Sequence, residues 1–81
     1  MDASLKITGY VNQRKVEIGQ NIRAWRRKRG LTQEEAAQHI GCSRKRINRA
    51  ERGYIELAVG ELELLANLLG AEFHQLIASP G

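Results

Sequence analysis

The sequence predicts an all-α fold of five helices in one domain, and three features lead to this prediction. Apolar residues recur at intervals of three and four through most of the chain, which is the period of amphipathic helices. Glycines stand directly behind several of these stretches, where a helix ends easily because glycine adopts positive φ without strain. The chain has one proline among 81 residues, which suits helices. A chain of this length buries one small core, so we expect a single domain.

Residues 16–29 are predicted to form the first helix. Ile18, Ile22 and Trp25 lie on one face at helical spacing and give the helix a side to bury. The cations of Arg26–Arg29 suit the negative end of the helix dipole, and that alone accounts for them. A nuclear-localisation signal or a membrane-binding patch is the less favoured interpretation, because the Trp25 stripe is needed for the core.

Residues 1–15, before this helix, are expected to form a flexible N-terminal arm, since short chain ends are usually poorly ordered. Leu5 and Ile7 allow a short strand as an alternative, which Gly9 would interrupt.

A helix-turn-helix is predicted in the middle of the chain. Thr32 and Glu35 have the spacing of a capping box, so a short helix begins at Thr32, and Gly41 ends it. Ser43 then caps a second helix over about residues 43–52, which leaves a turn of only two residues.

The outward face of this second helix is almost wholly cationic. Ile47 and Ala50 mark its inward side. Its remaining positions carry long donors or an amide, at Arg44, Lys45, Arg46, Asn48, Arg49 and Arg52. Such a helix fits the major groove of DNA, where Arg and Lys address guanine edges. A solvated helix without a partner is the other interpretation, because Lys and Arg are ordinary surface residues.

Residues 61–69 and 72–78 are predicted to be the last two helices, and residues 79–81 a tail or linker. Leucines at helical spacing give the longer of these helices an inward face. Apolar residues left outside that face predict a homodimer interface, with scattered exposure as the alternative. The predicted interface comprises Leu64, Leu68, Leu76 and Ile77.

The charge is divided between two parts of the chain. Residues 14–52 hold twelve Lys or Arg and four Glu, a net charge of +8, whereas residues 53–81 hold four Glu and no Lys or Arg, a net charge of −4. This asymmetry is expected where one face meets a polyanion and the other meets protein or solvent.

Several function classes are excluded by what the chain contains. His39, His74 and Cys42 have neither metal-ligand spacing nor the pattern of a nucleophile with its base, and no glycine-rich phosphate loop is present. We therefore expect no enzyme, no metal and no cofactor. Met1 is followed by an acid, and no apolar stretch reaches the roughly 18 residues of a membrane span, so a cytoplasmic location without a membrane partner is expected.

The chain resembles the phage-repressor and Cro type of helix-turn-helix domain, known as the XRE family, over residues 18–76. The matching motifs are I-G-x-x-I-R, G-L-T-Q, G-x-S, I-x-x-x-E-x-G and L-x-x-L-A-x-x-L-G. The resemblance implies a compact five-helix lambda-repressor-like domain, here over residues 16–78, that binds double-stranded DNA through the helix at residues 43–52.

Roles for individual residues also follow from this resemblance. It implies base contacts by Arg44, Lys45 and Arg49. It implies phosphate contacts or support of the second helix by Gln33, Ser43, Arg46, Asn48, Arg52 and Tyr54. It implies a structural ion pair between Arg26 and Glu51. Ala36 and Ala50 depart from the family by being small, so we expect Trp25 to help fill the core near them.

Two functions are open at this point. The first is a transcriptional regulator, expected to be a repressor, that binds a palindromic operator as a homodimer. The second is a protein-interaction module or an antitoxin of the same fold. The N-terminal arm would serve the first function by approaching the minor groove or phosphates, or by pairing with a second subunit.

Overall fold

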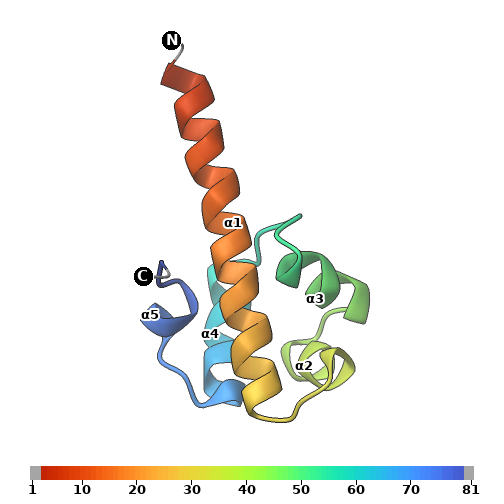
Figure 1. The fold of residues 1–81 in the computed structure, drawn as a ribbon. Coiled ribbons are helices and arrows are strands. Elements are labelled where there is room, and N and C mark those ends of the chain that lie inside the picture. Colours follow the sequence, from red (N-terminus) through yellow and green to blue (C-terminus); the bar gives the residue numbers. More distant parts are fainter. Residues whose placement is uncertain (1–2, 80–81) are drawn as a thin grey trace.

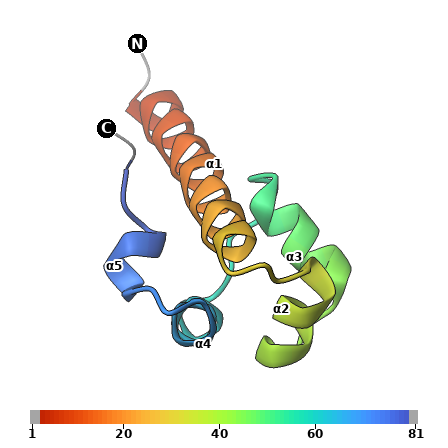
Figure 2. The same cartoon turned by 60° about the horizontal axis from the view of Figure 1, so that its bottom comes forward.

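The computed structural model describes residues 3–79, and their side chains from Lys6 onward. These residues form five helices and no strand, so the predicted all-α, five-helix fold is confirmed. The helices are α1 (Ala3–Lys28), α2 (Gln33–Ile40), α3 (Arg44–Glu51), α4 (Val59–Leu69) and α5 (Phe73–Leu76). The C-terminal half of α1 lies between the α2/α3 pair on one side and the α4/α5 pair on the other (Figures 1 and 2).

The first helix is much longer than the sequence analysis predicted. It begins at Ala3 rather than near residue 16, so residues 3–15 form neither a flexible arm nor a strand; residues 1–2 lie outside the described part. The physical reason is visible in the pattern, because Ile7 and Val11 stand on the same helical face as Ile18. Figure 1 shows the N-terminal half of α1 projecting beyond the other helices, which gives the molecule a longest dimension of 44 Å.

The core lies where α1, α2, α3 and α4 meet. It is built from aliphatic side chains of every helix and of the segment before α4: Ile22, Ala36, Ala37, Ile40, Ile47, Ala50, Leu57, Leu62, Leu65, Ala66, Leu69 and Leu76. Trp25 packs against this cluster from the side rather than entering it. Beside the small Ala50 a hollow of about 250 Å³ is left, lined mostly by apolar side chains.

The predicted apolar patch on the last two helices does not form as a patch. Leu76 is fully buried, because α5 packs against both α1 and α4, and Leu68 and Ile77 pack partly against the core. Leu64 alone is well exposed, at 44%. Leu76 therefore cannot contribute to a homodimer interface in this fold, and an interface through Leu64, Leu68 and Ile77 stays a prediction.

Polar contacts from α1 hold the C-terminal segment in place. The Asn21 side chain donates to the carbonyl oxygens of Leu76 (2.9 Å) and Ala78 (2.8 Å). Arg14 donates to the Ile77 carbonyl oxygen and to the Ser79 hydroxyl, and pairs with Glu17 at 2.9 Å. The segment up to Ser79, the first residue of the predicted tail, thus packs along α1.

Candidate nucleic-acid interface

Caps define the helix-turn-helix as the sequence predicted. The Thr32 hydroxyl accepts from the Glu35 N–H (3.1 Å), and the Glu35 carboxylate accepts from the Thr32 N–H (3.0 Å). These hydrogen bonds lower the pKa of the Glu35 carboxyl. Gly41 ends α2 with φ of 73°, and the Ser43 hydroxyl accepts from the Arg46 N–H at 3.1 Å to begin α3. The short turn fixes the angle between the two helices.

The outward side of α3 carries three cations. Ile47 and Ala50 bury the opposite side of the helix, while Arg44, Lys45 and Arg49 are exposed. None of the three side chains has a hydrogen bond or ion pair with another residue between 6 and 79. Their donors are therefore available to a ligand.

A network of hydrogen-bonded polar side chains connects α3 to α1 and α2. Arg26 donates to the Glu51 carboxylate through Nε (2.6 Å) and Nη2 (2.9 Å), and through Nη1 to the Leu31 carbonyl oxygen (2.8 Å). The hydrogen bond to Glu51 raises the pKa of Arg26. Gln33 donates to the same carboxylate (3.1 Å) and accepts from Asn48 at 3.4 Å. The structure thus brings together Arg26, Glu51, Gln33 and Asn48, and the ion pair implied by the resemblance is present.

Close packing also fixes the C-terminal end of α3 against α1. A Cβ at Gly19 would overlap the carbonyl oxygen of Ala50 and lie 2.8 Å from that of Glu51. Only glycine permits this approach of the two backbones, so α3 is held at a defined distance from α1.

The sequence analysis missed a basic hollow between α1 and α3. It has a volume of about 200 Å³, and its lining includes Arg23 and Arg27 of α1 and Arg52 behind α3. Gln33 and Asn48 also line it. The run of cations at the end of α1 had been assigned to the helix dipole as a whole. The signal available was the i, i+4 spacing of Arg23 and Arg27, which places both on one face.

Arg46 lies on the other flank of α3 and makes an ion pair that the sequence analysis did not predict, while its phosphate contact stays a prediction. Its Nε and Nη2 donate to Glu61 of α4 at 2.8 and 2.7 Å. The pair lowers the pKa of the Glu61 carboxyl. Arg46 therefore connects α3 to α4 through Nε and Nη2, while its side chain is still 39% exposed and its Nη1 has no hydrogen bond among residues 6–79. Tyr54 follows α3 and is exposed, as is Arg52.

Residues 3–79 contain no group of three or more His, Cys, Asp or Glu that could hold a metal ion. In the same part of the chain, no helix is long and apolar enough to cross a membrane. Cys42 packs against the core, and this burial raises the pKa of its thiol, so the thiolate is disfavoured.

A capped helix-turn-helix whose second helix has a cationic outward side is typical of DNA-binding regulators. The chain belongs to the HTH_3 family of helix-turn-helix proteins, whose model matches residues 22–76. The resemblance to the XRE family is thereby confirmed.

Individual relatives agree with this assignment. The chain is 32% identical over 63 residues to the Neisseria hypothetical transcription factor of Neisseria meningitidis serogroup B; the match covers 78% of this chain and 59% of that protein's length. The crystal structure of the hypothetical transcription factor NHTF from Neisseria has a TM-score of 0.76 at 30% identity, covering 83% of this chain and 77% of that one.

Two further solved structures are similar. The restriction-modification controller protein C.AhdI from Aeromonas hydrophila has a TM-score of 0.72 at 32% identity, covering 76% of this chain and 94% of that one. An HTH_3 family transcriptional regulator from Vibrio cholerae has a TM-score of 0.74 at 28% identity, covering 84% of this chain and 38% of that one.

Proposed function

We propose that the protein is a sequence-specific double-stranded DNA-binding regulator that places α3 in the major groove. The observation that carries this proposal is the outward side of α3, where Arg44, Lys45 and Arg49 have no partner among residues 6–79 while the opposite side is locked into the core. The major groove is about 12 Å wide and admits one α-helix. Long donors on such a helix reach the guanine O6 and N7 atoms.

Base reading and phosphate binding fall to different parts of this surface. We assign base contacts to Arg44, Lys45 and Arg49. Phosphate contacts are assigned to Ser43, Asn48, Arg52 and Tyr54, with Gln33 as a support at the start of α2. The basic hollow adds Arg23 and Arg27. Their guanidinium groups and that of Arg52 surround one concavity beside the Arg26–Glu51 pair, and such groups suit a backbone phosphate.

Regulation follows from occupancy of a promoter. The similarity to transcription factors and to a restriction-modification controller protein supports a regulator, and the resemblance to phage repressors supports repression. If two copies bind together, their two-fold symmetry requires a palindromic operator with half-sites about 10 bp, or about 34 Å, apart or a multiple of that. Such a regulator would act in the cytoplasm.

Selection from random duplex DNA at physiological salt tests the proposal. We expect an enriched inverted repeat, and Arg44→Ala or Arg49→Ala should relax its consensus at defined positions, each by about 1–3 kcal/mol of discrimination. Retention of no sequence would refute DNA binding and favour the protein-interaction or antitoxin function instead. Unchanged preference in both variants would refute the assignment of α3.

Adjacent residues supply a matched test of the basic hollow. Arg27 lines the hollow, whereas Lys28 lies 4.8 Å from the centre of the Trp25 ring and lines no part of it. Arg27→Ala should weaken binding to every sequence alike and reduce the salt slope by about 0.9, the value for one phosphate contact. Lys28→Ala removes the same charge and should leave the slope nearly unchanged. Equal effects of the two substitutions would show that only net charge matters.

A further inference from the structure

The projecting half of α1 exposes an apolar stripe. Residues 3–13 extend beyond the other helices (Figure 1), and the matched family region begins only at residue 22. Within them Ile7, Tyr10 and Val11 are 63%, 67% and 37% exposed. A cluster of large apolar side chains in one place is a sign of an interaction surface, in contrast to single exposed residues.

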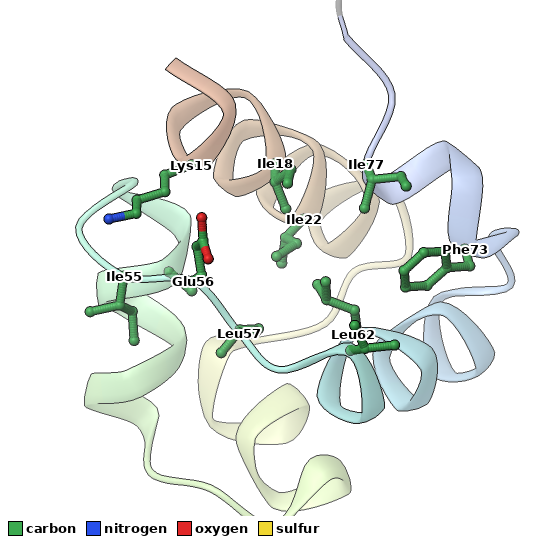
Figure 3. Close-up of a pocket in the computed structure, with 11 residues that line it drawn as sticks. Lys15, Ile18, Ile22, Ile55, Glu56, Leu57, Leu62, Phe73 and Ile77 are labelled. Atoms are coloured by element: carbon green, nitrogen blue, oxygen red, sulfur yellow. The ribbon is translucent and has the colours of Figure 1, made fainter. Parts of the chain in front are cut away.

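This stripe continues the face that α1 buries in the core. At about 100° per residue, Ile7 and Val11 each lie within about 20° of Ile18 around the helix. Ile18 packs against the core and Ile22, one turn later, is fully buried. Figure 3 shows Ile18 and Ile22 pointing into the hollow, with Lys15 of the preceding turn at its edge. The face is thus covered by the same chain at one end and open at the other.

The projecting residues also need packing in order to be helical. Ile7, Thr8, Tyr10 and Val11 are weak helix formers, and Gly9 costs about 1 kcal/mol relative to alanine. Helices shorter than about 12–15 residues are marginal in water even when their sequence is favourable. Contacts from a second molecule would add packing on the exposed apolar side chains Ile7, Tyr10 and Val11.

The charge of the projecting segment favours a second copy of this chain as its partner. Residues 3–13 carry one cation, Lys6, and no anion, so two copies repel each other only weakly and the segment does not match a strongly charged partner. Residues 14–52 carry a net +8, from twelve Lys or Arg and four Glu, so a parallel pair would bring two strongly basic regions together. An antiparallel pair places them at opposite ends.

We propose that residues 3–15 of α1 form a homodimerisation surface on which two copies pair antiparallel, with Ile7 of each copy against Val11 of the other. This pairing is centred on residue 9 and is self-complementary, as a two-fold interface requires. The N-terminal end of each helix then lies beside Lys15 of the other copy, at the edge of the apolar hollow. The inference does not depend on the proposed DNA binding.

The size of the contact sets the expected strength. Thirteen paired residues span about 20 Å, and with a helix about 10 Å wide they cover about 200 Å² per copy. Stable dimers bury about 800 Å² per partner, so this dimer should be weak and reversible, with a dissociation constant in the micromolar range or above. Two adjacent half-sites on DNA would strengthen it by raising the effective concentration.

Sedimentation equilibrium and circular dichroism of the full chain without DNA, at micromolar to millimolar concentration, test this proposal. We expect a monomer–dimer equilibrium with helix content that rises with concentration. Val11→Glu should raise the dissociation constant at least tenfold. Asn12→Glu adds the same charge about 100° away around the helix and should change it little. Only monomer at millimolar concentration, or equal effects of the two substitutions, would overturn the proposal. Trp25 fluorescence shows whether each variant keeps its folded body.

Cross-linking tests the orientation. In a Cys42→Ala background, Ile7→Cys and Val11→Cys chains are mixed and treated with a short bismaleimide. Antiparallel pairing predicts mainly mixed cross-links between positions 7 and 11, whereas a predominance of 7–7 and 11–11 cross-links would overturn it. The affinity for a DNA duplex with a single half-site distinguishes the dimerisation proposal from the DNA-binding proposal. Val11→Glu should leave that affinity unchanged. A dimeric wild type that binds no DNA would refute only the DNA-binding function.

Discussion

Removing Arg26 should destabilise the protein far more than removing any other cation of its α1 run. The Glu51 side chain is 3% exposed and that of Arg26 is 11% exposed. In Arg26→Met the aliphatic part of the side chain is kept, but Glu51 loses its counter-charge and two of its three hydrogen-bond donors, leaving only Gln33. Removing one partner of a buried ion pair lowers the free energy of unfolding by about 3–5 kcal/mol. A domain of this size has a total stability of about 4–12 kcal/mol, so much of it would be lost.

Urea unfolding followed by circular dichroism measures this loss. Arg27→Met, one residue away and exposed, is the matched control and should stay within about 0.5 kcal/mol of the wild type. The double variant Arg26→Met with Glu51→Leu leaves no buried charge, so it should cost less than the sum of the two single substitutions. That difference is the coupling energy of the pair.

Two results would refute this reasoning. The first is a loss below about 1 kcal/mol in Arg26→Met, which would mean that water reaches Glu51 and that its burial is not costly. The second is strict additivity in the cycle, which would mean that Arg26 contributes by packing alone. If Arg26→Met loses the expected stability, the variant should also bind all DNA sequences more weakly, because Glu51 and Gln33 orient α3.

Three further predictions concern packing, pH and capping. Gly19→Ala should lower the unfolding midpoint strongly because its Cβ meets the α3 backbone, whereas Gly9→Ala meets nothing within 4 Å and should stabilise the helix by about 0.5–1 kcal/mol in thermal unfolding. The pKa of Glu61 is lowered in the folded state, so its pairing with Arg46 stabilises the fold above the ordinary carboxyl pKa of 4.5 and is lost as the pH falls through the lowered value. Glu61→Gln should flatten the pH dependence of stability in that acidic range. Thr32→Ala should cost about 1 kcal/mol in urea unfolding by removing the N-cap of α2.

The middle of the fold could be predicted because its signals are local. Thr32 with Glu35, the positive φ at Gly41 and the cap at Ser43 each act within four residues, so the sequence alone locates α2, the turn and α3. The buried positions of α3, Ile47 and Ala50, follow from the same short-range periodicity.

The remaining features depend on contacts distant in sequence. Leu76 is buried because α5 packs against both α1 and α4. Asn21 of α1, which donates to the Leu76 carbonyl oxygen, is 55 residues away in the sequence. The pairing of Arg46 with Glu61 likewise requires α4 to lie beside α3, and no local pattern indicates it. The length of α1 was missed for another reason. Ile7 and Val11 share the helical face of Ile18 and Ile22, but Arg14 and Lys15 interrupt the apolar period between them, so the pattern alone does not carry the helix back to Ala3.

The electrostatics of α3 favour a ligand-binding role for its cations over a structural one. The N-terminus of a helix carries partial positive charge, so Arg44 and Lys45 in the first turn oppose the dipole, and α3 has no acid in that turn to offset them. A helix of eight residues has little stability of its own, so this unfavourable placement must be tolerated through tertiary contacts. Those contacts are the Glu51 pair at the end of α3 and the Arg46 pair near its start. Two ion pairs fix the helix that carries these cations although they oppose its dipole, and this agrees with the proposal that they meet an anion outside the protein.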